Sequence, residues 1–417
     1  MKRVHYWFGT AVLALMAAAL TFVLTYHFVV TPTVDKAVGQ AVEETKKAYD
    51  PYMKYGELSD KVVEVGAYLE EFFVGDYKVE DMKDAVASAM VAATGDEWSY
   101  YLSADELTAY YENMSNSYVG IGVTVSVSEE DGGLKVTDVT RDAPAYQAGI
   151  KVDDIITHVN GESTIELGLD ASRDRIRGEE GTQVTLTIKR NGEAFDLTLT
   201  RRSIQYEVVT YEVVADYVGL VTIPNFDEHV AQQTIIAVEE LKNLGVKSII
   251  FDVRFNPGGY KRELCAMLDY LLPEGIIFQS REKDGSEEII RSGKSYLDMP
   301  MAVLVNIESF SAAEFFGAAL QEYDAAVIVG EQTYGKGYFQ RTYQLSDGSG
   351  ITLSSGTYFT PNGVSLAGVG ITPDIVVELD DESYANLYYG LLAHEDDPQL
   401  QAAIHAMQEQ IGTNIAE

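Results

Sequence analysis

The sequence predicts an α/β core that carries an embedded all-β domain, with helical segments at both ends. Three observations lead to this expectation. Apolar strands alternate with helices after Ser203, which is typical of α/β folds. Short strands separated by Asn-Gly turns occupy the stretch before Ser203, and apolar residues recur at helical spacing before that stretch. The 417 residues, 46% of them hydrophobic, are enough for two or three domains with a sizeable core.

The first 30 residues predict a membrane anchor. Lys2 and Arg3 precede an uncharged stretch from Tyr6 to Val30, whose 25 residues exceed the roughly 20 that cross a bilayer. A cleaved signal peptide is the alternative, although its apolar region is usually only about 7–15 residues long. Because flanking basic residues stay in the cytoplasm, we expect a cytoplasmic tail at 1–5, a single-pass signal anchor at 6–30, and the catalytic part on the extracytoplasmic side of the cell membrane.

Charge and cysteine content restrict the partners and the chemistry. The 65 Asp and Glu against 30 Lys and Arg give a net charge of −35, which disfavours nucleic acid as a partner. Cys265 is the only cysteine, so no intrachain disulfide can form. It lies in an apolar Leu-Cys-Ala-Met-Leu run and is expected in the core. A hydrolase that uses Cys265 as its nucleophile is a competing hypothesis.

Residues 31–112 are predicted to be mostly helical. Apolar residues recur at helical spacing from Val62 to Phe73, and a second helix is expected from Asp81 to Ala93. Ser103, followed by two acidic residues, is a good N-cap for a third. A further helical region is expected at 381–417, where helices between Tyr384 and Ile411 could form a homodimer. Nothing in residues 31–112 suggests chemistry.

Residues 113–203 predict a small β domain. Its markers are the loop Gly120-Ile121-Gly122-Val123, the run Ala143-Pro144-Ala145 that leads to Gly149-Ile150, and the strand that ends at Asn160-Gly161. Together these features resemble a PDZ domain. The resemblance implies that the loop's backbone N–H groups bind the carboxylate of a peptide C-terminus. The following strand would then offer an edge on which the peptide adds as a further strand.

Residues 204–380 predict the α/β core. A Pro-Gly-Gly turn follows its second strand, and a polar turn with Ser309 and Ser311 follows the third. Lys336 lies between two glycines after the fourth strand. Strands are expected at Val218–Ile223, Val246–Val253, Met301–Val305, Ala325–Val329 and Ile351–Tyr358, and helices at Val230–Leu244, from the Pro-Gly-Gly turn to Leu272, and at Ala312–Tyr323.

A hydroxyl nucleophile in this core would need a base within hydrogen-bonding reach. None of the six histidines follows the order and spacing of a familiar Ser-His-Asp enzyme, and no Gly-x-Ser-x-Gly elbow occurs. A lysine can replace histidine if burial lowers its pKa. Lys336 has a suitable apolar setting, although a Gly-Lys-Gly run taken alone is more often a solvated turn. The histidines are His5, His27, His158, His229, His394 and His405.

Three motifs together resemble the C-terminal processing peptidases, the S41 family of serine peptidases. They are the Pro-Gly-Gly turn, Ser-x-Ser-Ala-x-Glu at the start of a helix, and Gly-Lys-Gly-x-x-Gln. The resemblance extends over residues 60–380 and implies a ClpP/crotonase-like β-β-α protease core with a Ser–Lys dyad. The family's nucleophile falls on Ser311, 25 positions before its base, Lys336. Its other site positions fall on Gln340, which would orient the lysine, and on Gly258 and Ala312 as backbone oxyanion donors.

The resemblance implies a membrane-anchored endopeptidase that acts without a metal or other cofactor. Its substrates would be proteins or peptides with exposed apolar C-termini, recognised by the PDZ domain, which would also gate the site. The family commonly has Ser where Ala313 stands and a smaller residue where Phe310 stands, and both departures affect the expected substrate preference. An inactive PDZ scaffold with a protease fold is the alternative function.

Overall fold

The computed structural model describes residues 54–416. The chain divides into two compact units, Met1–Val79 and Glu80–Glu417. The predicted anchor at 6–30 lies outside the described residues. No helix within 54–416 is long and apolar enough to cross a membrane.

The N-terminal region is helical, as predicted. Residues 54–72 are helical, and α3 (Val79–Ala92) and α4 (Ala104–Met114) follow. Ser103 caps α4 through a capping box, in which its hydroxyl accepts from Glu106 N and its own N–H donates to Glu106 Oε2. The short strand β1 (Tyr100–Leu102) between these helices was not predicted, and it pairs with the distant β18 (Gly350–Phe359).

The PDZ region forms its own sheet in the order β3-β4-β5-β7-β8. Both Asn-Gly turns have positive φ at both residues, as the predicted hairpins require. The helix α6 (Thr164–Ile176) was not predicted, and Gly168 interrupts it with a φ of 77°. The remaining elements are β3 (Val123–Ser128), β4 (Gly133–Val139), α5 (Pro144–Gln147), β5 (Ile155–Val159), β6 (Glu162–Ser163), β7 (Gln183–Arg190) and β8 (Glu193–Thr200).

Two antiparallel strands, β2 (Ser117–Gly120) and β9 (Arg202–Gln205), lie at the two ends of this region. A hydrogen bond from Tyr206 N to Asn116 O extends their pairing by one step. Asn116 also donates through its side chain to Asn225 and to Glu228 O, which belong to the following core. The two ends of the PDZ region, where the chain enters and leaves it, are therefore held together by β2 and β9.

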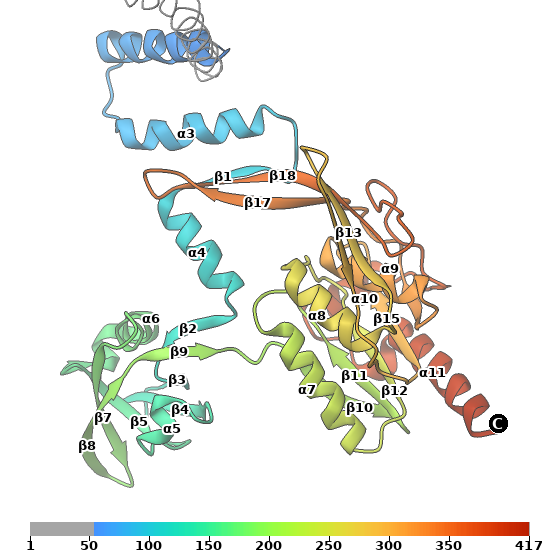
Figure 1. Ribbon diagram of the computed structural model, residues 1–417. Coiled ribbons are helices and arrows are strands. Elements are labelled where there is room, and N and C mark those ends of the chain that lie inside the picture. Colours follow the sequence, from blue (N-terminus) through green and yellow to red (C-terminus); the bar gives the residue numbers. More distant parts are fainter. Residues whose placement is uncertain (1–53, 417) are drawn as a thin grey trace, which may run out of the picture. The chain divides into compact units, whose positions relative to one another are not determined.

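The core sheet has the order β10-β11-β12-β15-β16-β19, and its strands are parallel except at the β10–β11 pair (Figure 1). One face packs against α7, α8 and α9, and the other packs against α11. This α/β arrangement confirms the predicted fold class. The elements are β10 (Thr210–Ala215), β11 (Val218–Thr222), α7 (Val230–Asn243), β12 (Ser248–Asp252), α8 (Lys261–Leu271), β15 (Met301–Val305), α9 (Ala312–Glu322), β16 (Ala326–Gly330), β19 (Ile375–Val376) and α11 (Pro398–Ala416).

A second, antiparallel sheet has the order β1-β18-β13-β14, with β17 also paired to β18 (Figure 1). Its strands β13 (Ile276–Glu282), β14 (Glu287–Arg291) and β17 (Tyr338–Gln344) were not predicted. Most of their residues are partly or fully exposed. These strands therefore lack the long apolar run by which a buried strand is predicted. After the core sheet, the chain ends with α10 (Asp381–Tyr388), a short 3₁₀ turn (His394–Asp396) and α11, as the expected C-terminal helical region requires.

Candidate active site

Ser311 lies at a sharp turn between a buried strand and a buried helix. All five residues of β15 are buried, and so are residues 312–320 at the start of α9. Ser311 itself is half-buried and has φ 60° and ψ −120°, a conformation that non-glycine residues rarely adopt. Such strain costs on the order of 1–3 kcal/mol and persists where the surrounding packing enforces it, often at active sites. The packing of β15 and α9 supplies that enforcement.

Ser309, the other serine of the turn, is committed to structure. It is fully buried, its hydroxyl donates to Val253 O at 2.7 Å, and the same oxygen accepts from Asn306 N at 3.0 Å. A hydroxyl held in this way cannot reach a substrate. The geometry therefore favours Ser311 over Ser309 as the nucleophile, in agreement with the spacing.

Glu314 connects the serine turn to the lysine loop. Its carboxylate is fully buried and accepts from Ser311 N at 3.1 Å and from Lys336 N at 2.9 Å, both at the same oxygen. The other oxygen accepts from Thr333 Oγ1 and Gly335 N, both at 2.6 Å. Burial raises the pKa of this carboxyl, and the four hydrogen bonds oppose that rise. This glutamate belongs to the Ser-x-Ser-Ala-x-Glu motif, but the motif alone predicts no role for it.

Lys336 has the environment that a lysine base needs. It is partly buried, and burial lowers its pKa to about 8, while Glu314, Asp96 and Glu97 act in the opposite direction. Its Nζ lies 4.0 Å from the centre of the Trp98 ring. Within residues 54–416, no hydrogen bond joins this amine to Ser311. The backbones of the serine and the lysine thus share an anchor, but no hydrogen bond joins their side chains within the described residues.

Gln340 does not contact Lys336 in this structure. It lies on β17, and its amide nitrogen donates to Tyr338 O at 3.1 Å and to Ser354 Oγ at 3.2 Å. The orienting hydrogen bond to the lysine that the family resemblance implies is therefore not formed here.

The two expected oxyanion donors lie next to each other. A β-carbon placed on Gly258 would be 2.9 Å from Ala312 N and 2.8 Å from Ser311 Cβ. The N–H of Gly258, however, donates to Asn256 Oδ1 at 2.8 Å. Asn256 is fully buried and also donates to Ile223 O, so it shapes the Pro-Gly-Gly turn. Ala312 N–H is therefore the donor of the two that is not already bonded within the described part of the chain.

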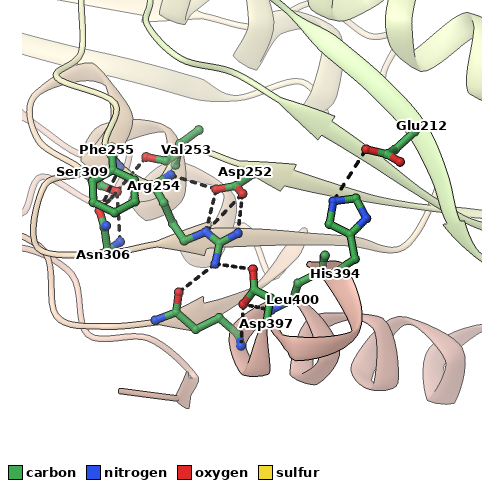
Figure 2. A network of polar contacts seen from close by, with 11 residues as sticks. Glu212, Asp252, Val253, Arg254, Phe255, Asn306, Ser309, His394, Asp397 and Leu400 are labelled. Carbon is green, nitrogen blue, oxygen red and sulfur yellow. Dashed lines mark hydrogen bonds and ion pairs between the residues drawn. The ribbon is translucent and has the colours of Figure 1, made fainter. Parts of the chain in front are cut away.

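Arg254 anchors the start of that turn from the other side (Figure 2). Its buried guanidinium pairs with Asp252 at 2.6 Å and with Asp397 at 2.9 Å, and it donates to Gln399. Asp397 also accepts from the first N–H groups of α11, at Gln399 and Leu400. The network fixes the C-terminal helix to the end of β12, consistent with a structural role for Arg254.

Three aromatic residues pack against one another beside the site, and the sequence did not predict this packing. Trp98 contacts Phe310 and Tyr334 with ring centres 5.8 and 5.4 Å apart, and Phe310 contacts Tyr334 at 6.0 Å. Phe310 directly precedes Ser311. The sequence singled out Phe310 as unusual, but nothing in it connected Trp98 to a residue more than 200 positions later.

Cys265 lies on α8 and is buried in the core, as predicted. Burial raises the pKa of its thiol to about 12. Because the thiolate is the reactive form, Cys265 is a poor nucleophile at neutral pH, which disfavours the competing hypothesis.

The predicted peptide-binding loop connects β2 to β3. Ile121 is buried, Gly122 has a φ of 79°, and Val123 begins β3, which is the edge strand of its sheet. A cavity of about 380 Å³ lies between the far end of β3 and α6. Its lining residues are Val127, Glu129, Gly132 and Leu134 on the sheet side and Thr164, Ile165, Gly168 and Leu169 on the helix side.

Residues 217–377 match the model of peptidase family S41, and residues 135–190 match that of the PDZ domain. A "Probable CtpA-like serine protease" of Staphylococcus saprophyticus is 33% identical over 322 residues, which cover 76% of this chain and 65% of the relative. A protein of the same description from Staphylococcus epidermidis is 33% identical over 318 residues, which cover 74% and 64%. The chain thus spans just under two thirds of these relatives. The solved structure of a photosystem II D1 C-terminal processing protease aligns with a TM-score of 0.46 at 25% identity, over 81% of this chain and 92% of that one.

Proposed function

We propose, from the match of residues 217–377 to peptidase family S41 and of residues 135–190 to the PDZ domain, that the protein is a serine endopeptidase with a Ser311–Lys336 dyad. It would cleave protein substrates that its PDZ domain recognises by their C-termini. It would act on the extracytoplasmic side of the membrane, anchored through residues 6–30.

The observation that supports the dyad most strongly is the shared oxygen of Glu314. Because Ser311 N and Lys336 N both donate to Oε2, these two backbone nitrogens are no more than about 6 Å apart. The side chains of the two residues therefore start from neighbouring positions. We expect a rotation of the flexible lysine side chain to bring its amine to the serine hydroxyl.

The chemistry is acyl transfer. Neutral Lys336 takes the proton of the Ser311 hydroxyl as Oγ attacks the carbonyl carbon of the scissile peptide bond. The resulting ammonium gives that proton to the leaving nitrogen as the C–N bond breaks, which leaves an ester on Ser311. Lys336 then takes a proton from water, whose oxygen attacks the ester. Cleavage of the ester bond returns the proton to Ser311 and releases the new carboxyl end.

Backbone donors would stabilise the negative oxygen of each tetrahedral intermediate. Ala312 N–H, at the first position of α9, is the more available candidate, because the described residues show no hydrogen bond from it. The positive end of the helix dipole adds to its effect. Gly258 N–H can join only after it breaks its 2.8 Å hydrogen bond with Asn256. Donors of this kind contribute roughly 10²–10³-fold each to the rate.

The edge strand β3 supports the proposed mode of substrate recognition. An extended peptide can pair with β3 while its carboxylate binds the N–H groups of residues 120–123. The cavity between β3 and α6 would take an apolar side chain of the same peptide. A substrate with an exposed apolar C-terminus meets these requirements, and its binding would be the signal that opens the site.

Turnover of a peptide with a free apolar C-terminus tests the assignment. We expect cleavage by the wild-type chain, loss of cleavage in Ser311→Ala and in Lys336→Met, and full activity in Cys265→Ala. The same peptide with an amidated C-terminus should be cleaved more slowly. Unchanged turnover in Ser311→Ala would refute the nucleophile. Peptide binding without turnover in the wild type would favour the inactive PDZ scaffold instead.

Localisation has a separate test. Protease added outside intact cells should digest a tag fused after Glu417 and leave a tag fused before Met1 intact. The reverse pattern would contradict the proposed orientation.

A further inference from the structure

The amine of Lys336 rests against an aromatic ring from a distant part of the chain. Its Nζ lies 4.0 Å from the centre of the Trp98 ring, well inside the roughly 6 Å range of cation–π contacts. Within residues 54–416, this amine has no hydrogen bond or ion pair. The Trp98 ring is therefore the direct polar contact that the described residues show for it.

Trp98 is itself firmly positioned. It directly precedes Ser99, whose hydroxyl accepts from Ser354 N at 3.0 Å, and β1 then pairs with β18. The rings of Phe310 and Tyr334 pack against it from the serine turn and the lysine loop. The ring thus belongs to the same framework that carries the site.

Several charged and titratable groups face the lysine. Asp96 and Glu97 precede Trp98, and Glu314 lies on α9, and all three favour the ammonium. The Tyr334 hydroxyl donates to Glu97, and the buried Tyr358 hydroxyl on β18 donates to Lys336 O. Burial opposes the ammonium. The Trp98 face adds to the groups that favour the charged form, because its attraction depends on the positive charge.

We propose that Trp98 is a positioning residue for the general base: its ring holds the Lys336 ammonium at rest, unbonded to Ser311, and releases the amine once it is neutral. A neutral amine loses the attraction to the ring and is then free to turn to the serine hydroxyl. Trp98 thereby sets the pH at which the base becomes available. The catalytic consequence rests on the proposed function, whereas the resting contact does not.

The test is a titration of Lys336 in the Ser311→Ala protein, with competitive acetylation read by mass spectrometry. Trp98→Leu keeps an apolar cover over the amine but removes the aromatic face. The midpoint of the Lys336 titration in this variant should fall by about 0.4–1.5 pH units, which is the equivalent of one cation–π contact. In Trp98→Phe, the midpoint should fall by less. Phe310→Leu removes a neighbouring ring without a contact to the amine, and its midpoint should not move.

A midpoint in Trp98→Leu that stays the same or rises would overturn the proposal, and so would an equal fall in Phe310→Leu. With Ser311 restored, the acidic limb of kcat/KM in Trp98→Leu should move down by the same interval as the midpoint. If the midpoints shift but neither the wild type nor any variant with Ser311 restored cleaves peptide, the proposed function fails, while the contact between Trp98 and Lys336 is supported. If all forms cleave and the midpoint does not shift, only the role of Trp98 fails.

Discussion

Gly258 lies so close to Ser311 that a β-carbon on the glycine would be 2.8 Å from the β-carbon of the serine. Two non-bonded β-carbons do not approach each other this closely, so the backbone would have to shift. Gly258 also has a φ of 93°, which side-chain-bearing residues rarely adopt. The Pro-Gly-Gly turn and the serine turn are thus shaped to each other, although 53 positions separate these two residues in the chain.

Gly258→Ala should therefore damage the site. We expect kcat/KM to fall by about 10²-fold or more, since Ser311 and Ala312 must move relative to any substrate. Gly245→Ala is the matched control. Gly245 has a φ of 88°, but a β-carbon there would meet nothing within 4 Å, so this variant has similar backbone strain without the collision. Equal losses of peptidase activity in the two variants would show that strain, and not contact with Ser311, matters at Gly258.

Glu314→Gln should uncouple the serine turn from the lysine loop. The amide keeps the shape of the side chain, but its NH₂ group would face two of the four donors that the carboxylate now accepts from. We expect a loss of about 1–3 kcal/mol in the free energy of unfolding and a fall in kcat/KM of about 10²-fold. Glu106→Gln, in the exposed capping box of α4, should change neither by much, because Gln is also favoured there. Denaturant unfolding and peptide turnover of both variants provide the check.

The pH profile should show a lysine base. With a pKa of about 8, only about a tenth of Lys336 is neutral at pH 7, so kcat/KM should rise about tenfold from pH 6 to 7 and level off above pH 8. An acidic limb near pH 6.5 would indicate a histidine base and contradict the dyad. The same pKa shift also makes the stability of the fold depend on pH. Between about pH 8 and the ordinary lysine value of 10.5, the unfolded chain binds more protons, so the Lys336 contribution to stability rises with pH in that window.

Sequence patterns were sufficient to predict the central strands of the core sheet. These strands are buried on both faces, so each one is a largely apolar run. β15 was predicted with its observed ends, and β11, β12 and α9 to within two residues. The antiparallel sheet was mostly missed because β14 and β17 carry charged and polar residues among exposed positions. Short runs of this kind resemble loops until a partner strand from elsewhere in the chain satisfies their hydrogen bonds.

The sequence suggests candidate site residues where one short stretch contains them, and it does not where distant segments meet. Ser311, Lys336 and Glu314 all lie between positions 309 and 337. The approach of Trp98 to the lysine depends on the pairing of β1 with β18, which no local pattern reveals. Nor could a sequence motif show that the side chain of Asn256 already occupies Gly258 N–H.

Val127→Asp should weaken peptide binding by the PDZ region. Val127 lines the cavity beside β3 and is 51% exposed, and Val152, at 52%, lies outside that cavity. A carboxylate at position 127 would lose apolar contact and remain partly desolvated beneath a bound peptide. We expect Kd for a peptide with an apolar C-terminus to rise about tenfold or more in fluorescence anisotropy, while Val152→Asp leaves Kd unchanged. Equal effects of the two substitutions would place the peptide elsewhere.

Arg254→Met should destabilise the fold through α11. The substitution leaves Asp252 and Asp397 facing each other in a buried site without the guanidinium, and uncompensated burial of this kind typically costs about 3–5 kcal/mol. Arg281→Met, which breaks an exposed pair with Glu287, should cost less than about 1 kcal/mol. Because Asp397 also caps α11, hydrogen exchange should accelerate over residues 398–411 in the Arg254 variant.

A second substitution separates lost pairing from stranded charge. If the cost of Arg254→Met comes mainly from the buried carboxylates, Asp397→Asn should restore part of the stability lost in Arg254→Met, since it removes one of those charges and keeps the N-cap. Asp397→Asn alone should be destabilising, because it removes an anion from beside the buried guanidinium. A double variant less stable than Arg254→Met would mean that Asp397 stabilises α11 through its charge at the helix N-terminus rather than through Arg254. A complete double-mutant cycle in denaturant unfolding measures this coupling directly.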